Sequence, residues 1–115
     1  MNLDGRVMGV TTTADQGMVG TDTRLSFRQR GSRVLARYGG SRVVRGYLVG
    51  RLSGSHLRFR YLQVEVSGEI HGGTSLCDLV PLADGRIRIL EHFKWRSRAG
   101  YGTNVFEELV EEKLS

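Results

Sequence analysis

Residues 25–38 have the sequence LSFRQRGSRVLARY, two apolar-rich stretches that meet at the dipeptide Gly31-Ser32. Glycine accepts the positive φ angle of a tight turn, so a two-residue loop of this kind predicts a β-hairpin. Similar dipeptides separate stretches rich in Val, Leu, Ile, Phe and Tyr at Gly54-Ser55, Ser67-Gly68 and Asp84-Gly85. Together the four turns predict a continuous antiparallel meander.

The expected strands follow these turns along the whole chain, which we treat as a single domain, residues 1–115. The apolar spacing at 105–112 fits a short helix as well as a strand, and we favour a strand for its first half. Strand patterns occur at about 4–10, 20–30, 33–39, 43–52, 56–66, 69–80, 86–96 and 102–112.

Two-residue loops at all four turns would set one register, with apolar groups on one face. A slip of one residue in any hairpin would invert a strand. The expected pairs include Phe27 with Ala36, Gly50 with Phe59, Phe59 with Leu76, Tyr61 with Thr74, Leu76 with Phe93 and Asp78 with Glu91. The other face would carry Arg28, Arg33, Arg37, Arg51, Arg58, Arg60, Arg86 and Arg88.

The predicted fold class is all-β: an antiparallel up-and-down meander that closes into a small, about eight-stranded, lipocalin-like β-barrel. A sandwich is the alternative, but short hairpins with few long crossovers favour the barrel. Gly46 and Gly50 fall opposite large residues, as a curved sheet requires. A barrel of eight strands is filled by its side chains or holds one small ligand.

The composition limits the classes of protein to consider. Cys77 is the single cysteine, which excludes an internal disulfide. No apolar run approaches the roughly 20 residues of a membrane-spanning helix. The first residues lack the basic-then-apolar pattern of a signal peptide. We therefore expect a cytoplasmic protein with no membrane partner.

The charge is uneven along the chain. Residues 1–60 carry 11 Arg and 3 Asp, a balance of +8, whereas the remainder carries 6 basic and 9 acidic side chains, a balance of −3. A basic surface suggests nucleic acid, an anionic membrane or an acidic ligand. We favour solvated outer strand faces, since aromatic residues and arginines alternate to opposite faces, which argues against nucleic-acid binding. A homodimer through the outer faces is an alternative that the dense arginines disfavour.

Glu91 is the strongest candidate for chemistry, because it shares its predicted face with Ile87, Ile89, Phe93 and Trp95. A carboxylate among apolar neighbours is costly unless it is paired or protonated. It could be a general base, a polar anchor for a ligand, or a structural partner of an Arg or Tyr. Asp78 would form an acid/base pair with it. If the Asp84-Gly85 turn has three residues, or Pro81 forces a bulge, Cys77 faces Glu91 instead.

The favoured function is binding of a small apolar or aromatic metabolite inside the barrel. Its expected contacts are Tyr38, Phe59, Tyr61, Gln63, Phe93, Trp95 and, from a rim loop at 100–104, Asn104. The alternative is a cofactor-independent cyclase, isomerase or dehydratase in which Glu91 moves a proton. We expect no cofactor, and no metal, since His56, His71 and His92 lack the spacing of a metal site.

Several stretches resemble a small bacterial family of β-barrel proteins whose members often carry the label N-acetylglutamate synthase. The resemblance covers most of the chain from about residue 25 and is carried by residues 46–50, 57–61, 68–70, 84–88, 91–95 and 102–108. It implies no catalytic residues. The architecture is similar to that of lipocalin-like and avidin-like barrels, which implies ligand binding by analogy of fold.

The acetyltransferase label conflicts with the sequence. Acetyltransferases of the usual kind bind the CoA pyrophosphate with an Arg/Gln-x-x-Gly-x-Gly/Ala loop that opens a helix. The nearest candidates, residues 28–33 and 37–42, both end in Arg and lie in predicted hairpins. We therefore reject acetyl transfer.

Overall fold

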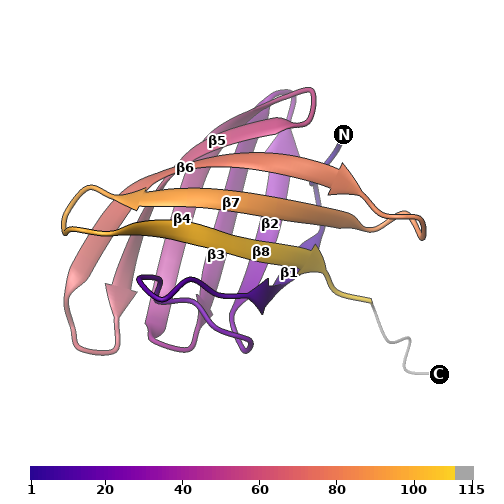
Figure 1. Cartoon of the computed structure of the whole chain (residues 1–115). Helices are drawn as coiled ribbons and strands as arrows, with labels where there is room; N and C mark the ends of the chain where they lie inside the picture. Colours follow the sequence, from indigo (N-terminus) through magenta and orange to yellow (C-terminus); the bar gives the residue numbers. More distant parts are fainter. Residues whose placement is uncertain (111–115) are drawn as a thin grey trace.

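The computed structural model describes residues 1–110 and forms a closed antiparallel barrel in which each strand pairs with the next along the chain (Figure 1). The predicted all-β meander is confirmed. The strands are β1 (Val7–Thr12), β2 (Arg24–Arg30), β3 (Arg33–Gly40), β4 (Val43–Ser53), β5 (His56–Glu65), β6 (Ile70–Pro81), β7 (Ile87–Trp95) and β8 (Tyr101–Glu108).

Pairing of β1 with β8 closes the sheet, with Val10 opposite Phe106. The barrel is flattened, with extents of 38 × 34 × 23 Å. In Figure 1, β6, β7 and β8 cross in front of β2 to β5, so the molecule has two broad sides. The segment 105–108 is strand rather than helix. The end of the strand expected at 102–112 lies outside the described residues.

The hairpins at Gly31-Ser32 and Gly54-Ser55 have the predicted register. Phe27 lies opposite Ala36, and Gly50 lies opposite Phe59. Gly31 and Gly54 each occupy the first position of a two-residue loop with φ of 60°. A positive φ at that position, followed by a residue with negative φ, is the geometry of the type II′ turn. In both loops, glycine comes before serine.

The register predicted for β6 is wrong, because the loops on both sides of it have three residues. The Glu65 amide donates to the Glu69 carbonyl, and the Leu82 amide donates to the Arg86 carbonyl. Gly68 and Gly85 are the third residues of these loops, with φ of 90° and 88°. A three-residue hairpin loop commonly ends on such a left-handed glycine. In both loops, glycine comes last.

The extra loop residue shifts β6 by one position against both of its neighbours. Ser75, and not Leu76, lies opposite Phe59 and Phe93. Since side chains alternate along a strand, this inverts the whole of β6. Its inward residues are Gly73, Ser75, Cys77 and Leu79, whereas Thr74, Leu76 and Asp78 turn outward. The two shifts cancel, so β7 keeps its predicted inward face.

Aromatic side chains occupy much of the interior, and glycines on neighbouring strands make room for two of them. Gly46 and Gly73 point inward, where a Cβ atom would overlap the rings of Tyr38 and Tyr61, respectively. Such close approach explains why glycine occupies strand positions that it otherwise weakens. Within residues 1–110, no helix has the length and apolar character of a membrane span.

We expect Gly46→Ala to destabilise the protein by about 2 kcal/mol, because the added methyl group forces the Tyr38 ring out of its packed position. The measurement is the free energy of unfolding from urea denaturation. Ser53→Ala, at an exposed position near the end of the same strand, is the control and should change stability little. Equal stability of the two variants would show that the Tyr38 ring moves aside without cost.

Candidate functional site

A cavity lies inside one end of the barrel. We call this cavity the mouth. The free volume of this cavity is about 30 Å³, so side chains nearly fill it. Its lining combines aromatic and aliphatic walls with a few polar groups: Gly17, Met18, Val19, Leu25, Tyr38, Leu48, Phe59, Tyr61, Gln63, Glu91, Phe93, Trp95, Asn104 and Phe106.

The segment 13–19, between β1 and β2, covers the mouth. Ala14, Met18 and Val19 pack against the core. The Ala14 amide donates to Asn104 Oδ1 over 3.0 Å, and Trp95 Nε1 donates to the Gln16 carbonyl over 2.9 Å. A short irregular segment held by a few hydrogen bonds opens more easily than the strands beneath it. Sequence reasoning left this segment without a role.

Glu91 lies at the base of this mouth, and it is 5% exposed. Ser75 Oγ donates to its Oε2 over 2.7 Å, and Asn104 Nδ2 donates to its Oε1 over 2.9 Å. Burial raises the pKa of Glu91 above the usual 4.5, and the two hydrogen bonds oppose that shift only in part. Glu91 is therefore a buried carboxyl group that has two neutral hydrogen-bond partners and binds its proton more tightly than an exposed glutamate does.

Asp78 does not face Glu91, and the predicted carboxylate pair is wrong. The shifted register of β6 places Cys77 opposite Glu91, which is the alternative left open for a three-residue turn. Asp78 lies on the outer surface, where its carboxylate is 2.9 Å from His56 Nδ1. Burial and the charge of Glu91 raise the pKa of the Cys77 thiol, which therefore stays protonated.

Tyr61 carries an unpartnered polar atom in the interior. Its hydroxyl group is buried and has no hydrogen-bond partner among the described residues. The ring packs edge-on against Trp95, with the centroids 5.3 Å apart. Burial and the charge of Glu91 raise the pKa of Tyr61, so the phenol remains neutral and can donate. A buried unpaired hydroxyl costs roughly 1–3 kcal/mol, which a partner at this position would recover.

A second set of polar groups forms a continuous chain toward the rim. Tyr38 donates to Gln63 Oε1 over 2.8 Å, and Gln63 Nε2 donates to Glu65 Oε2 over 2.9 Å. Arg98 pairs with Glu65 over 2.5 Å and stacks over the Trp95 ring at 4.6 Å. Each group in this chain has a partner, so the chain positions Tyr38 and Gln63 rigidly.

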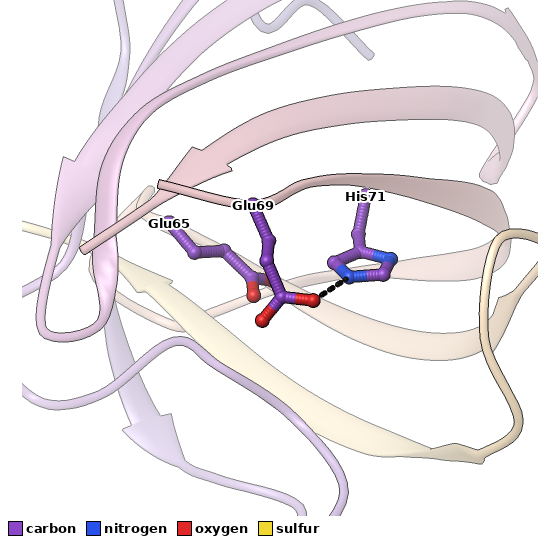
Figure 2. Close-up of side chains that lie close together, drawn as sticks. All are labelled: Glu65, Glu69 and His71. Atoms are coloured by element: carbon purple, nitrogen blue, oxygen red, sulfur yellow. Dashed lines mark hydrogen bonds and ion pairs between the residues drawn. The ribbon is translucent and has the colours of Figure 1, made fainter. Parts of the chain in front are cut away.

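Three side chains that could hold a metal ion lie close together on this rim. Figure 2 shows Glu65, Glu69 and His71, whose candidate ligand atoms lie within 4.8 Å of one another. Sequence spacing did not predict this cluster, because a hairpin loop separates Glu65 from the other two. Each already has partners: Arg98 binds Glu65, Ser97 binds His71 Nδ1, and His71 Nε2 lies 3.3 Å from Glu69. The Arg98 guanidinium already neutralises Glu65, so the geometry favours an ion-pair network.

The structure brings most of the predicted site residues together. Glu91 and all seven predicted ligand contacts line the mouth, and Asp78 does not. Asn104 reaches the site from inside β8 rather than from a rim loop, since the strand begins at Tyr101. Sequence reasoning missed Ser75, because the register error turned it outward, and Gly17, Met18 and Val19, because the segment 13–19 has no periodic pattern.

A family model described as avidin-like protein matches residues 1–109. No curated protein matches the chain significantly. No solved structure does so either.

The raised pKa of Glu91 predicts a pH-dependent contribution to stability. The folded protein binds this proton more tightly than the unfolded chain does, so the contribution is complete below pH 4.5 and is lost as the pH rises through the raised pKa. Glutamine binds no proton but can keep both hydrogen bonds. We therefore expect the stability of the wild type relative to Glu91→Gln to fall as the pH rises above 4.5, measured by urea denaturation across pH.

Glu69→Gln is the matched control for this experiment. Hydrogen bonds from His71 and Ser67 lower the pKa of the exposed Glu69 carboxyl group, so its contribution is present above pH 4.5 and is lost on acidification. The relative stability of wild type should then change in the opposite direction. A pH-independent difference for Glu91→Gln would show that Glu91 titrates normally in the folded state.

Proposed function

The chain belongs to the avidin-like family, whose barrels bind small ligands, and from this premise we propose that it binds a small neutral apolar or aromatic metabolite in the mouth. The observation that carries the proposal is the buried hydroxyl of Tyr61, which has no partner among residues 1–110. Buried polar groups in folded proteins are nearly always hydrogen-bonded. A ligand atom that bonds this hydroxyl would remove the exception.

The lining of the mouth supports an apolar or aromatic ligand. The rings of Phe59, Tyr61, Phe93 and Trp95 meet edge-to-face, with neighbouring centroids 5.3–6.1 Å apart. Apolar walls with a few fixed polar groups are typical of small-molecule sites. The favoured ligand has a flat or compact apolar body and one hydrogen-bonding group for Tyr61.

The electrostatics of the mouth favour a neutral ligand. Glu91 has a raised pKa, and the phenols of Tyr38 and Tyr61 stay protonated. The nearby Arg98 already pairs with Glu65. An anion would find no free cation among the described lining residues, and both carboxyl oxygens of Glu91 already accept hydrogen bonds, from Ser75 and Asn104.

The size of the cavity requires the covering segment to move. About 30 Å³ is too small for a metabolite, whereas ligand pockets usually measure about 300–1,000 Å³. We infer that a ligand displaces Met18 and Val19, since these residues of the covering segment line the cavity. Segment 13–19 then acts as the entrance, and its hydrogen bonds to Asn104 and Trp95 re-form over the bound molecule.

Trp95 provides a direct measurement, because it is the single tryptophan and lines the mouth. We expect benzamide, which can bond Tyr61, to change Trp95 fluorescence saturably. Tyr61→Phe should weaken benzamide binding about fivefold, which corresponds to the roughly 1 kcal/mol of one hydrogen bond. Toluene, which forms no hydrogen bond, should bind both forms equally.

Tyr101→Phe is the control variant, since Tyr101 is 76% exposed and does not line the mouth. It should leave both affinities unchanged. The proposal fails if neither probe gives a saturable change. It also fails if Tyr61→Phe weakens both probes equally, because the hydroxyl would then have no specific role in recognition.

A second candidate function is cofactor-independent acid/base catalysis, favoured by the raised pKa of the buried Glu91 beside the cavity. The Glu91→Gln variant distinguishes the two functions for any compound whose binding changes Trp95 fluorescence saturably. In a binding protein it should cost at most about 1 kcal/mol of affinity, the worth of one hydrogen bond. In an enzyme it should preserve binding and lower turnover by about 10²-fold or more, measured by product formation.

A further inference from the structure

The outer side of β2 to β5 carries an unusual charge distribution. From Arg24 to Val64 the chain has ten arginines, no lysine and no carboxylate. All ten arginines are exposed. None of them forms an ion pair with a carboxylate of residues 1–110, whereas Arg6 and Arg88 pair with glutamates of β8 and Arg86 pairs with Asp84. We call the outer surface of β2 to β5 the arginine face.

Four of these arginines form a row across the strands. Arg30 lies opposite Arg33, Arg33 opposite Arg51, and Arg51 opposite Arg58. Neighbouring strands are about 5 Å apart, so four like charges stand side by side across the sheet. Like charges in directly opposite positions destabilise a sheet. The row is therefore a cost to folding that an anionic partner would offset.

The centre of the arginine face is apolar. Leu35 pairs with Val49, and Tyr47 pairs with Leu62, so the four side chains form one cluster. Each is more than half exposed. Arg28 and Arg60 flank this cluster in the row that contains Leu35 and Val49. The face thus has an apolar centre and a cationic rim.

Two open hollows mark the same face. One, of about 530 Å³, is lined by the side chains of Arg28, Leu35, Arg37, Tyr47 and Val49, among others. The other, of about 380 Å³, lies beside Arg24 and Arg45 and shares Arg37 with the first. The guanidinium groups around these hollows can bind phosphate oxygens in pairs, while the aliphatic walls receive apolar groups.

Contrary to the expectation from the sequence that the protein has no membrane partner, we propose that the arginine face docks on an anionic lipid bilayer surface, with the phosphates on the arginines and the apolar cluster at the level of the headgroups. Each arginine close to an anionic bilayer contributes about fivefold to binding. Aliphatic side chains at the centre of a cationic face add apolar contact with the interface. The broad side that β2 to β5 form in the flattened barrel suits a planar partner (Figure 1).

Other occupants fit the face less well. A second copy would bring ten arginines against ten, with no carboxylate on either face. Single-stranded nucleic acid would use the arginines but needs aromatic platforms for its bases. Three of the four central side chains are aliphatic, and Tyr47 is the one aromatic residue among them. A bilayer fits both parts of the arginine face, because its phosphates can bind the arginines of the rim and its interface can contact the central cluster.

The test is co-sedimentation with vesicles of equal parts phosphatidylglycerol and phosphatidylcholine, compared with phosphatidylcholine alone. We expect salt-sensitive binding to the anionic vesicles only. Arg28→Gln with Arg37→Gln should weaken it by about 25-fold. Lys94→Gln with Arg96→Gln changes the net charge equally on the opposite side and should have little effect. Circular dichroism checks that each variant folds.

Leu35→Ser with Val49→Ser tests the apolar centre and should weaken vesicle binding about tenfold while sparing the charge. If this variant binds the anionic vesicles as tightly as the wild type, the proposal is overturned, because positive charge alone would then explain the binding. Absence of binding to anionic vesicles would overturn it as well. Tighter binding to an oligothymidylate, with no effect of Leu35→Ser and Val49→Ser, would assign the face to nucleic acid instead.

Discussion

Closure of the sheet between β1 and β8 is the constraint on which the rest of the structure depends. A closed sheet has no free edge, so the facing of each strand is fixed through the hydrogen bonds to both neighbours. Side chains alternate strictly along a strand, and the inward set is therefore decided by the number of loop residues. The composition of the interior, including Glu91 and Tyr61, follows from loop lengths as much as from the strands themselves.

Much of the fold could be predicted because apolar alternation and glycine turns agree along most of the chain. The error in β6 has a specific cause, namely the position of glycine within its dipeptide. In Gly31-Ser32 and Gly54-Ser55 the glycine opens a two-residue loop, whereas Gly68 and Gly85 close three-residue loops. Alternation in β6 did not correct the error, because Leu76 and Val80 are apolar residues that lie outside.

The candidate site shows the same limit. Site residues on β3, β4 and β5 were placed correctly because the hairpins at Gly31-Ser32 and Gly54-Ser55 have the predicted register. Those on β7 were placed correctly because the two shifts around β6 cancel. Ser75 and the segment 13–19 were missed, because one depends on register and the other has no periodicity. The difference has chemical consequences: with Ser75 and Asn104 as its partners, Glu91 is a solitary buried acid rather than half of a carboxylate pair, so its pKa is governed by burial instead of by a second charge.

The two three-residue loops that flank β6 are coupled in length. If one residue were deleted from only one of these loops, β6 could not pair with both neighbouring strands and keep the same side chains pointing inward. Deleting one residue from both would invert β6 while the other seven strands kept their facing. Paired one-residue deletions in these two loops are therefore expected to exchange the whole inward surface of β6, from Gly73 to Leu79, by changes made only outside the strand.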